Sequence, residues 1–342
     1  MDLTIIIPTK NRFKFIEKVI KYYSSLEFKG DLLIVDSSEN SIFEEQSKLF
    51  NKYKNLNILH YYSPYTTILA AKEHLDKIKK NYVTLTGDDD YQILSGIKDA
   101  INYLEKNTNI NAIRGNSYLF DIISNSKVNK IYDYNGNEYL DNNIIDRILK
   151  FFEHPRSVCS NIWKSTSFKN ALKEFLKFDE IKDCPDRYFY DEILFTSVLV
   201  ANNKIKRINS DQFVMTLNSQ RLKDRKWEVL NYNNLIKSIE FTSKKLFDIL
   251  SRNQKNVLST DKQIILKGIE KFIFNKYLPA LKRSNGSKKS FRKTLIRIFK
   301  IIKIYNLLKK VKNLFHKETI TYNIDNLKED INFKQVFKNI EN

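Results

Sequence analysis

The chain has 342 residues, which is enough for one large domain with an extension or for two domains. Its two cysteines, Cys159 and Cys184, belong to no CxxC or Cys/His cluster, so neither a disulfide framework nor a structural zinc site is indicated. No stretch approaches the roughly 20 apolar residues that span a bilayer, and the first apolar run does not read as a signal peptide. We therefore expect a globular protein of a reducing, cytoplasmic compartment.

The first 120 residues alternate short apolar runs with helical patterns. The runs at 3–9, 31–38, 55–62 and 82–86 predict four strands, and the patterns at 13–26, 42–53, 68–78 and 92–106 predict helices between and after them. A further strand is expected near residue 109. Strands and helices that alternate with short connections predict an α/β fold, a mostly parallel Rossmann-like sheet with helices on both faces.

The remainder of the chain becomes helical. A helix is predicted at 143–153, another begins near residue 190, and two long helical patterns follow at 229–250 and 261–281. We divide the chain into an α/β domain at 1–220, a helical extension at 221–283, and a basic helix with a tail at 284–342.

Polar side chains gather where the predicted strands end. Because ligands of such sheets bind outside the carboxyl ends of the strands, we expect these side chains to face one crevice. They are Pro8, Thr9, Asn11 and Arg12 after the first strand, Asp36, Ser37 and Ser38 after the second, and Asp88, Asp89 and Asp90 after the fourth.

The three consecutive aspartates need an explanation because neighbouring carboxylates repel one another. One interpretation is a solvated turn that caps the following helix, where acids are favoured. A single cap needs only one carboxylate, however. A divalent cation held by these oxygens and carrying a phosphate on its other side explains all three better.

The order of five short motifs resembles a family 2 glycosyltransferase of the GT-A fold, over roughly residues 3–210. The motifs are "TIIIPTKNR", "LLIVDSS", "ILAAKEH", "VTLTGDDDY" and "YDEILFTSVLVANNKI". The resemblance implies that Pro8, Thr9, Asn11, Arg12, Asp36 and Ser37 hold the base and ribose of a nucleotide sugar. It also implies that Asp88 and Asp90 hold the metal, Mn or Mg, that bridges the donor diphosphate, with Asp89 between them at the donor site.

Two further positions follow from the same resemblance. Lys72 stands where the family usually has a phosphate-binding arginine, and its alternative is an ordinary exposed helix lysine. Asp191 falls in the position of the catalytic base of inverting members, with Glu192 in reserve. One carboxylate there would take the proton from the acceptor hydroxyl. The alternative is an acid stabilised by a helix N-terminus.

Two aromatic residues between these motifs allow two interpretations each. Trp163 lies where acceptor-binding segments fall, so it could stack on a sugar ring or could belong to the core. His154 could line the acceptor side or could be a turn residue.

Positive charge is concentrated near the C-terminus. Between Lys282 and Lys317 there are 13 basic residues and no acidic one, in a chain with a net charge of +19. Apolar residues recur at helical spacing within 288–316, which predicts an amphipathic helix suited to an anionic membrane surface. A helix packed on the protein or on a second copy is the main alternative. No recognised nucleic-acid-binding module is present, so we expect no nucleic-acid partner.

The resemblance, together with these patterns, implies an inverting glycosyltransferase whose catalytic domain is the α/β domain at 1–220. The expected donor is a uridine diphosphate sugar, and the expected acceptor is a hydroxyl of a cell-surface glycan or lipid-linked glycan at the inner face of the cytoplasmic membrane. The "DSSEN" motif, Asn202 in place of a glycine and the lack of a late histidine leave open a non-catalytic, membrane-associated glycan-binding or scaffold protein. A sugar nucleotidyltransferase is less consistent, because "PTKNRFKF" contains no glycine-rich phosphate loop.

Overall fold

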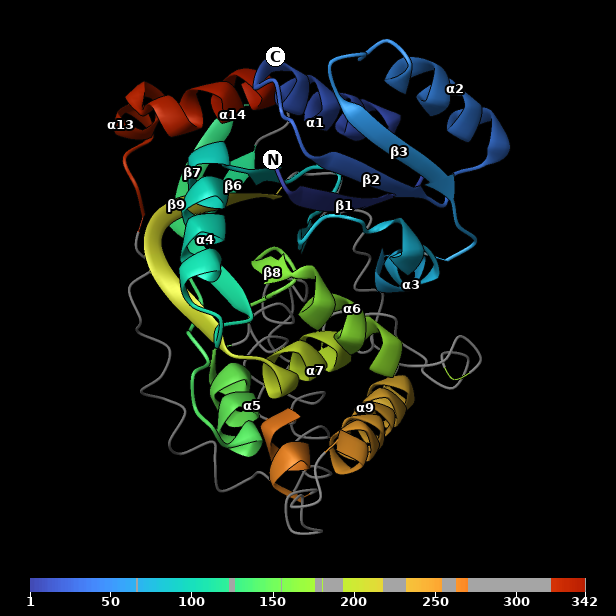
Figure 1. Ribbon diagram of the computed structural model, residues 1–342, viewed down its shortest axis with the longest axis vertical. Coiled ribbons are helices and arrows are strands. Elements are labelled where there is room, and N and C mark those ends of the chain that lie inside the picture. Colours follow the sequence, from blue (N-terminus) through green and yellow to red (C-terminus); the bar gives the residue numbers. More distant parts are fainter. Residues whose placement is uncertain are drawn as a thin grey trace, which may run out of the picture.

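The computed structural model describes residues 1–65, 67–122, 127–154, 156–175, 180, 193–217, 232–253, 263–269 and 321–341, without the side chains of 232–236 and 253. These residues form one nine-stranded sheet with helices on both faces (Figure 1). The predicted α/β fold class is confirmed.

The N-terminal half of the sheet is parallel, in the order β3-β2-β1-β4. Its strands are β1 (Leu3–Thr9), β2 (Asp31–Asp36), β3 (Asn57–Tyr62) and β4 (Tyr82–Leu85), as the sequence predicts. Thr9 lies opposite Asp36, which in turn lies opposite Tyr62. The register therefore brings the carboxyl ends of three strands to one edge.

The other half of the sheet is mixed. β6 (Ala112–Ile122) runs parallel to β9 (Ile205–Leu217), while β8 (Ile162–Lys164) is antiparallel to both β4 and β6. The short strand β5 (Tyr91–Gln92) pairs with β9, and β7 (Val128–Asp133) pairs with β6. β5 directly follows the three aspartates. The chain therefore leaves β4 and crosses to β9 at the edge of the sheet where β1 and β2 end.

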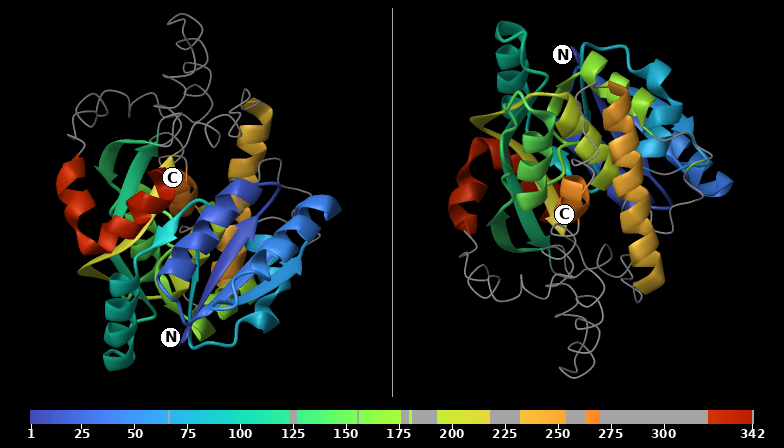
Figure 2. Two further views of the ribbon diagram at one scale, coloured as in Figure 1. Left: turned by 90° about the horizontal axis from the view of Figure 1, so that it is seen from above. Right: turned by 90° about the horizontal axis from the view of Figure 1, so that it is seen from below.

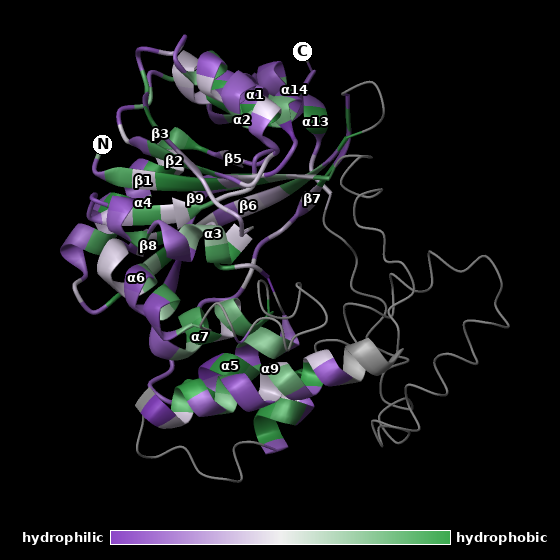
Figure 3. Cartoon of the chain, turned by 90° about the vertical axis from the view of Figure 1, so that its right-hand side faces the viewer, coloured by the Kyte–Doolittle hydropathy of each residue, from purple (hydrophilic) through white to green (hydrophobic). Residues whose placement is uncertain are grey.

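Alternate residues of β1 enter the two cores of the molecule. Ile5 and Ile7 pack with α1 (Phe13–Ser25), α2 (Asn40–Phe50) and α4 (Leu94–Lys106), and Ile6 packs on the opposite face. That opposite face is covered by α3 (Thr67–Glu73), α5 (Ile144–Glu153), α6 (Ser165–Glu174), α7 (Phe195–Asn202) and α9 (Tyr232–Asn253). Figure 3 shows α1 and α2 above the sheet and α6, α7 and α9 below it. A short 3-10 turn, η1 (Leu75–Lys77), follows α3, so the helix predicted at 68–78 is shorter than expected.

The end of the chain returns to the part of the molecule that contains α1 and the β6–β7 hairpin. α13 (Ile324–Glu329) and α14 (Ile331–Glu341) lie against α1 and the β6–β7 hairpin (Figure 2). Phe333, Val336, Phe337 and Ile340 of α14 are buried in the same core as Ile5 and Ile7. The sequence analysis placed these residues in a tail and did not foresee this packing.

Two expectations about the C-terminal region remain predictions. The basic segment 288–316 lies outside the described residues, and the division of the chain into three parts is not tested. None of the helices in the described ranges combines the length and apolar character needed to cross a bilayer.

Candidate functional site

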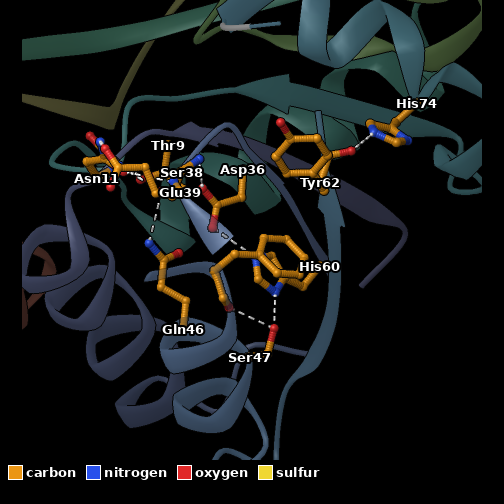
Figure 4. A network of polar contacts seen from close by, with 12 residues as sticks. Thr9, Asn11, Asp36, Ser38, Glu39, Gln46, Ser47, His60, Tyr62 and His74 are labelled. Carbon is orange, nitrogen blue, oxygen red and sulfur yellow. Dashed lines mark hydrogen bonds and ion pairs between the residues drawn. The ribbon is translucent and has the colours of Figure 1, made fainter. Parts of the chain in front are cut away.

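The loops after β1 and β2 are joined by backbone and side-chain hydrogen bonds. Ser37 N donates to Thr9 O at 2.9 Å, and Asn11 N donates to Ser38 Oγ at 2.7 Å. Asn11 has a left-handed backbone (φ 53°), which asparagine tolerates better than most residues, and its Oδ1 accepts from Glu39 N at 3.1 Å. Figure 4 shows this network at the edge of the sheet. The structure thus brings together the residues that the sequence analysis assigned to this crevice after the first two strands.

Asp36 is fully buried at the end of β2 and is held from two sides. Its Oδ1 accepts a hydrogen bond from Ser38 N at 2.8 Å, and its Oδ2 lies 3.1 Å from His60 Nε2. His60 Nδ1 lies 2.9 Å from Ser47 Oγ, and the imidazole stacks on Phe43 with ring centroids 4.1 Å apart. The carboxylate is therefore oriented by its neighbours, as Figure 4 shows.

The sequence analysis missed His60 as part of this site. Tyr62 lies opposite Asp36, so His60, two residues earlier on β3, is the diagonal neighbour of Asp36 on the same face of the sheet. The predicted pairing of these two strands could therefore have identified His60 as a neighbour of Asp36.

Asp88 and Asp89 share one guanidinium. Arg12 Nη1 lies 2.6 Å from Asp88 Oδ1, and Arg12 Nη2 lies 2.8 Å from Asp89 Oδ2. Thr9 Oγ1 donates to the other oxygen of Asp88 at 2.8 Å. The guanidinium of Arg12 also lies over the ring of Phe15, 4.2 Å from its centroid. In this state Arg12 therefore compensates part of the carboxylate charge.

Asp90 is held from the opposite side of the site by β9. Thr216 N donates to Asp90 Oδ1 at 2.8 Å, and Thr216 Oγ1 donates to Asp89 O at 2.7 Å. Sequence reasoning missed Thr216, because a polar residue in a strand carries no signal of its partner. Gly87 faces the same carboxylates, since a Cβ there would lie 2.8 Å from Asp90 Oδ2 and 3.2 Å from Asp89 Oδ1.

The capping interpretation of the aspartates is wrong. α4 begins at Leu94 after the N-cap Ile93, and its first turn contains no acidic residue. β5 separates the aspartates from this helix. All three carboxylates are buried, with at most 4% of each residue exposed, so a solvated turn is also excluded.

Burial makes the charge of Asp88 costly. Desolvation raises the pKa of Asp88 from 3.8 to about 7, and repulsion from Asp89 adds to the rise. Arg12 and the hydrogen bond from Thr9 lower the pKa of Asp88 but do not cancel these effects. The site would thus gain from additional positive charge.

The carboxylates of this site would suit a divalent cation that takes only part of its coordination from the protein. Carboxylate oxygens are the ligands that Mg and Mn prefer, and the missing Cβ of Gly87 leaves the carboxylates of Asp89 and Asp90 free of a clash. Within the described residues, no group of three or more His, Cys, Asp or Glu side chains is arranged to hold a metal ion. A cation here would therefore draw part of its coordination from phosphate or water.

The structure gives Lys72 and Pro8, the two remaining donor-site candidates, other surroundings. Lys72 Nζ donates to Phe175 O at 3.2 Å, and burial lowers the pKa of its ammonium group. No hydrogen bond or ion pair among the described residues joins Lys72 to the aspartates. Pro8 is half-buried in β1 opposite Val35, and the hydroxyl of Ser37 donates to the carbonyl of Tyr65.

Of the two interpretations of Trp163, the core residue is confirmed and stacking on a sugar ring is wrong. It is fully buried in β8, and its Nε1 donates to Val158 O at 2.8 Å. His154, by contrast, is exposed at the end of α5. Asp191 and Glu192 lie outside the described residues, so their assignment stays a prediction.

Comparisons with known proteins identify the fold. No family model matches the chain, and no curated protein matches its sequence. The structure of S. aureus TarS 1-349 in complex with UDP-GlcNAc matches with a TM-score of 0.50 and 13% identity, covering 80% of this chain and 81% of that one. A longer S. aureus TarS structure matches with a TM-score of 0.49 and 14% identity over 80% of this chain, which spans only 44% of it.

A third match is the mannosyltransferase PcManGT from Pyrobaculum calidifontis in complex with GDP-Man and Mn2+. Its TM-score is 0.45 at 13% identity, with 93% of this chain and 88% of that chain covered. At such identities structural likeness shows a shared fold alone. The chain shares the α/β fold of TarS 1-349, in agreement with the sequence prediction.

Proposed function

We propose that the protein is an inverting glycosyltransferase that moves a sugar from a nucleotide-sugar donor, a UDP-sugar, to an acceptor hydroxyl. The observation that carries this proposal is the group of buried aspartates with Arg12 and Thr9 at the carboxyl edge of a parallel sheet. Ligands bind at this edge in open α/β sheets. The shared fold with TarS 1-349, which was solved with UDP-GlcNAc, supports the choice of donor.

The donor base and ribose would lie over the loops after β1 and β2. Pro8, Thr9, Asn11, Asp36 and Ser37 supply backbone groups, hydroxyls and one oriented carboxylate there. Their hydrogen bonds to one another hold this surface in place before a ligand arrives, which reduces the ordering cost of binding. Lys72, whose ammonium group loses solvation by burial, would add positive charge for a phosphate if it turned from Phe175.

The diphosphate would lie beside the aspartates. Asp88 and Asp90 would hold a divalent cation, Mn or Mg, with Asp89 beside them. When bound, such a cation would offset the negative charge of the departing nucleoside diphosphate. The bond from Thr216 N holds Asp90 in a fixed orientation for this role.

Inversion requires one displacement, in which the acceptor oxygen attacks the anomeric carbon while the nucleoside diphosphate leaves. Asp191, or Glu192 in reserve, would accept the proton of the acceptor hydroxyl. This assignment rests on the sequence resemblance. It predicts that Asp191→Asn binds the donor as the unaltered protein does but does not transfer the sugar.

The acceptor would be a glycan of the cell surface or a lipid-linked glycan. The basic segment 288–316 supports this proposal, because its positive charge matches an anionic membrane where such acceptors reside. Sedimentation of the full chain with vesicles that contain anionic lipid tests it, with neutral vesicles as the control. Equal binding to both vesicle types would count against the membrane proposal.

The donor site is tested by calorimetric titration with nucleoside diphosphates, with and without Mn. We expect one nucleotide to bind in a metal-dependent manner and the double variant Asp88→Asn, Asp90→Asn to lose that binding. The double variant Asp76→Asn, Asp99→Asn removes two exposed carboxylates away from the site and is the matched control. If the unaltered protein binds no nucleotide under any condition, the scaffold alternative replaces the enzyme.

A further inference from the structure

Arg12 occupies the position where a cation is expected to act. Its two terminal nitrogens reach two different carboxylates, Asp88 at 2.6 Å and Asp89 at 2.8 Å. A guanidinium is a rigid planar fork, and here each terminal nitrogen donates to a separate acid. The residue thus acts as an internal counter-ion for the site.

The pairing is built into the fold on both sides. Arg12 is the N-cap residue of α1, directly after β1, and its guanidinium lies 4.2 Å from the centroid of the Phe15 ring one turn later. Asp88 and Asp89 are nearly fully buried, whereas the Arg12 side chain is 21% exposed. Arg12 is therefore the member of this group with a route to solvent.

A divalent cation and Arg12 cannot both interact closely with Asp88 at low cost. The two oxygens of Asp88 are already engaged, one by Arg12 and one by Thr9. A second cation beside the guanidinium would meet like-charge repulsion, and burial of the site weakens solvent screening. Metal binding is therefore expected to drive Arg12 away from the carboxylates.

We propose that Arg12 and the divalent cation exchange on Asp88 and Asp89, and that the released guanidinium then binds the diphosphate of the donor. The inference rests on the proposed function. It assigns Arg12 two successive partners, carboxylates in the resting protein and phosphate in the donor complex. Arg12 thereby couples metal binding to donor binding.

The local structure favours a phosphate near the released side chain. The first turn of α1 contains no acidic residue, so the positive end of the helix dipole is not offset there. Arginine pairs with phosphate through two parallel hydrogen bonds. A small rotation of Arg12 away from the aspartates would leave it beside this helix terminus.

The exchange predicts that one substitution, Arg12→Gln, strengthens metal binding and weakens nucleotide binding. Arg12→Gln removes the competing cation, so we expect Mn alone to bind about tenfold more tightly than to the unaltered protein. With Mn saturating, we expect a nucleoside diphosphate to bind about tenfold more weakly, because the phosphate ligand is gone. Arg12→Lys keeps the charge without the fork and should give smaller shifts in both measurements.

The experiment measures Mn binding by electron paramagnetic resonance of the free ion and nucleoside diphosphate binding by calorimetry. Lys10→Gln is the matched control, because it removes the same charge from an exposed residue two positions away. It should change neither binding constant by more than about twofold. Circular dichroism checks that each variant is folded.

The outcomes separate this inference from the proposed function. Mn binding that is unchanged or weaker in Arg12→Gln, or absent from every variant, overturns the exchange. Nucleotide binding that is unchanged in Arg12→Gln overturns the second role of Arg12. If the unaltered protein binds no nucleoside diphosphate, the proposed function fails, and with it the second role.

Discussion

His60 Nε2 lies 3.1 Å from Asp36 Oδ2, and this is the contact between a fully buried carboxylate and the neighbouring strand. The imidazole is stacked on Phe43 and lies edge-on to Phe50, so it cannot move away without losing packing. A residue assigned to donor binding is thus held by one that plays no part in the proposed chemistry. His60 is a positioning residue for Asp36.

Replacing His60 should therefore destabilise the protein. His60→Leu keeps the approximate volume but leaves the Asp36 carboxylate without its partner on β3. A buried charge that loses its partner costs about 3 kcal/mol. Chemical denaturation monitored by circular dichroism measures the change in the free energy of unfolding.

His74→Leu is the matched control for this prediction. His74 Nε2 contacts the backbone carbonyl of Tyr62 at 3.0 Å and lies 3.9 Å from the Glu73 carboxylate, which is partly exposed, so its loss should cost less than about 1 kcal/mol. Equal losses of stability for the two variants would show that the contact with Asp36 contributes no more to the free energy of unfolding than the contact with a backbone carbonyl.

The raised pKa of Asp88 predicts an unusual dependence of stability on pH. The pKa is about 7 in the folded protein against 3.8 for the ordinary group, so the folded state binds the proton more tightly. Protonation of Asp88 therefore stabilises the metal-free protein. This contribution is fully present below pH 3.8 and is lost as the pH rises through about 7.

Asp88→Asn isolates that contribution, because the amide stays neutral at every pH. With a chelator present, we expect Asp88→Asn to gain on the unaltered protein as the pH rises. The difference between their free energies of unfolding should be larger at pH 8 than at pH 5 by about 2 kcal/mol or more. Asp99→Asn removes an exposed carboxylate and should show no such divergence. A constant difference between Asp88→Asn and the unaltered protein from pH 5 to 8 would contradict the raised pKa.

Gly87→Ala should impair the site without disrupting the fold. The new methyl would lie 2.8 Å from Asp90 Oδ2, closer than a carbon and an oxygen approach without strain. Since Thr216 N holds the other oxygen of Asp90, the carboxylate would have to turn. We expect metal-dependent nucleotide affinity to fall about tenfold. Unchanged affinity in calorimetry would show that the Asp90 carboxylate can shift without consequence.

The sequence was sufficient to predict the architecture near the site, because apolar periodicity identifies strands and helices and the edge rule gathers their carboxyl ends. It could not predict which groups pair across that edge. Arg12 and Asp88 are 76 positions apart, and their contact depends on how two loops meet in space. The resemblance assigned Arg12 to nucleotide binding, and nothing in it indicated that Arg12 pairs with Asp88 and Asp89.

The environment of Trp163 and the packing of α14 also depend on contacts between segments that are distant in the sequence. Trp163 suits a sugar site or a core equally well by composition, and only its position between β4 and β6 decides for the core. In the tail, the spacing of Phe333, Phe337 and Ile340 does indicate one apolar helix face. The surface that receives that face is formed by β6, β7 and α1, which lie about 200 to 320 positions earlier, and no local pattern reveals it.

Packing of α14 on the sheet predicts that the end of the chain contributes to global stability. Phe333 is fully buried, with its ring centroid 4.9 Å from that of Tyr118 and 6.4 Å from that of Phe120. Phe333→Ala should cost about 3 kcal/mol or more, because it removes a large buried side chain and leaves a cavity. The free energy of unfolding from chemical denaturation measures this loss.

Ile331→Ala provides the matched control on the same helix. Ile331 is 86% exposed, so its truncation should change the free energy of unfolding by no more than about 0.5 kcal/mol. If Phe333→Ala were as stable as Ile331→Ala, α14 would not be part of the cooperative core. A large difference between them would show that residues beyond 320 fold together with the strands that carry the site.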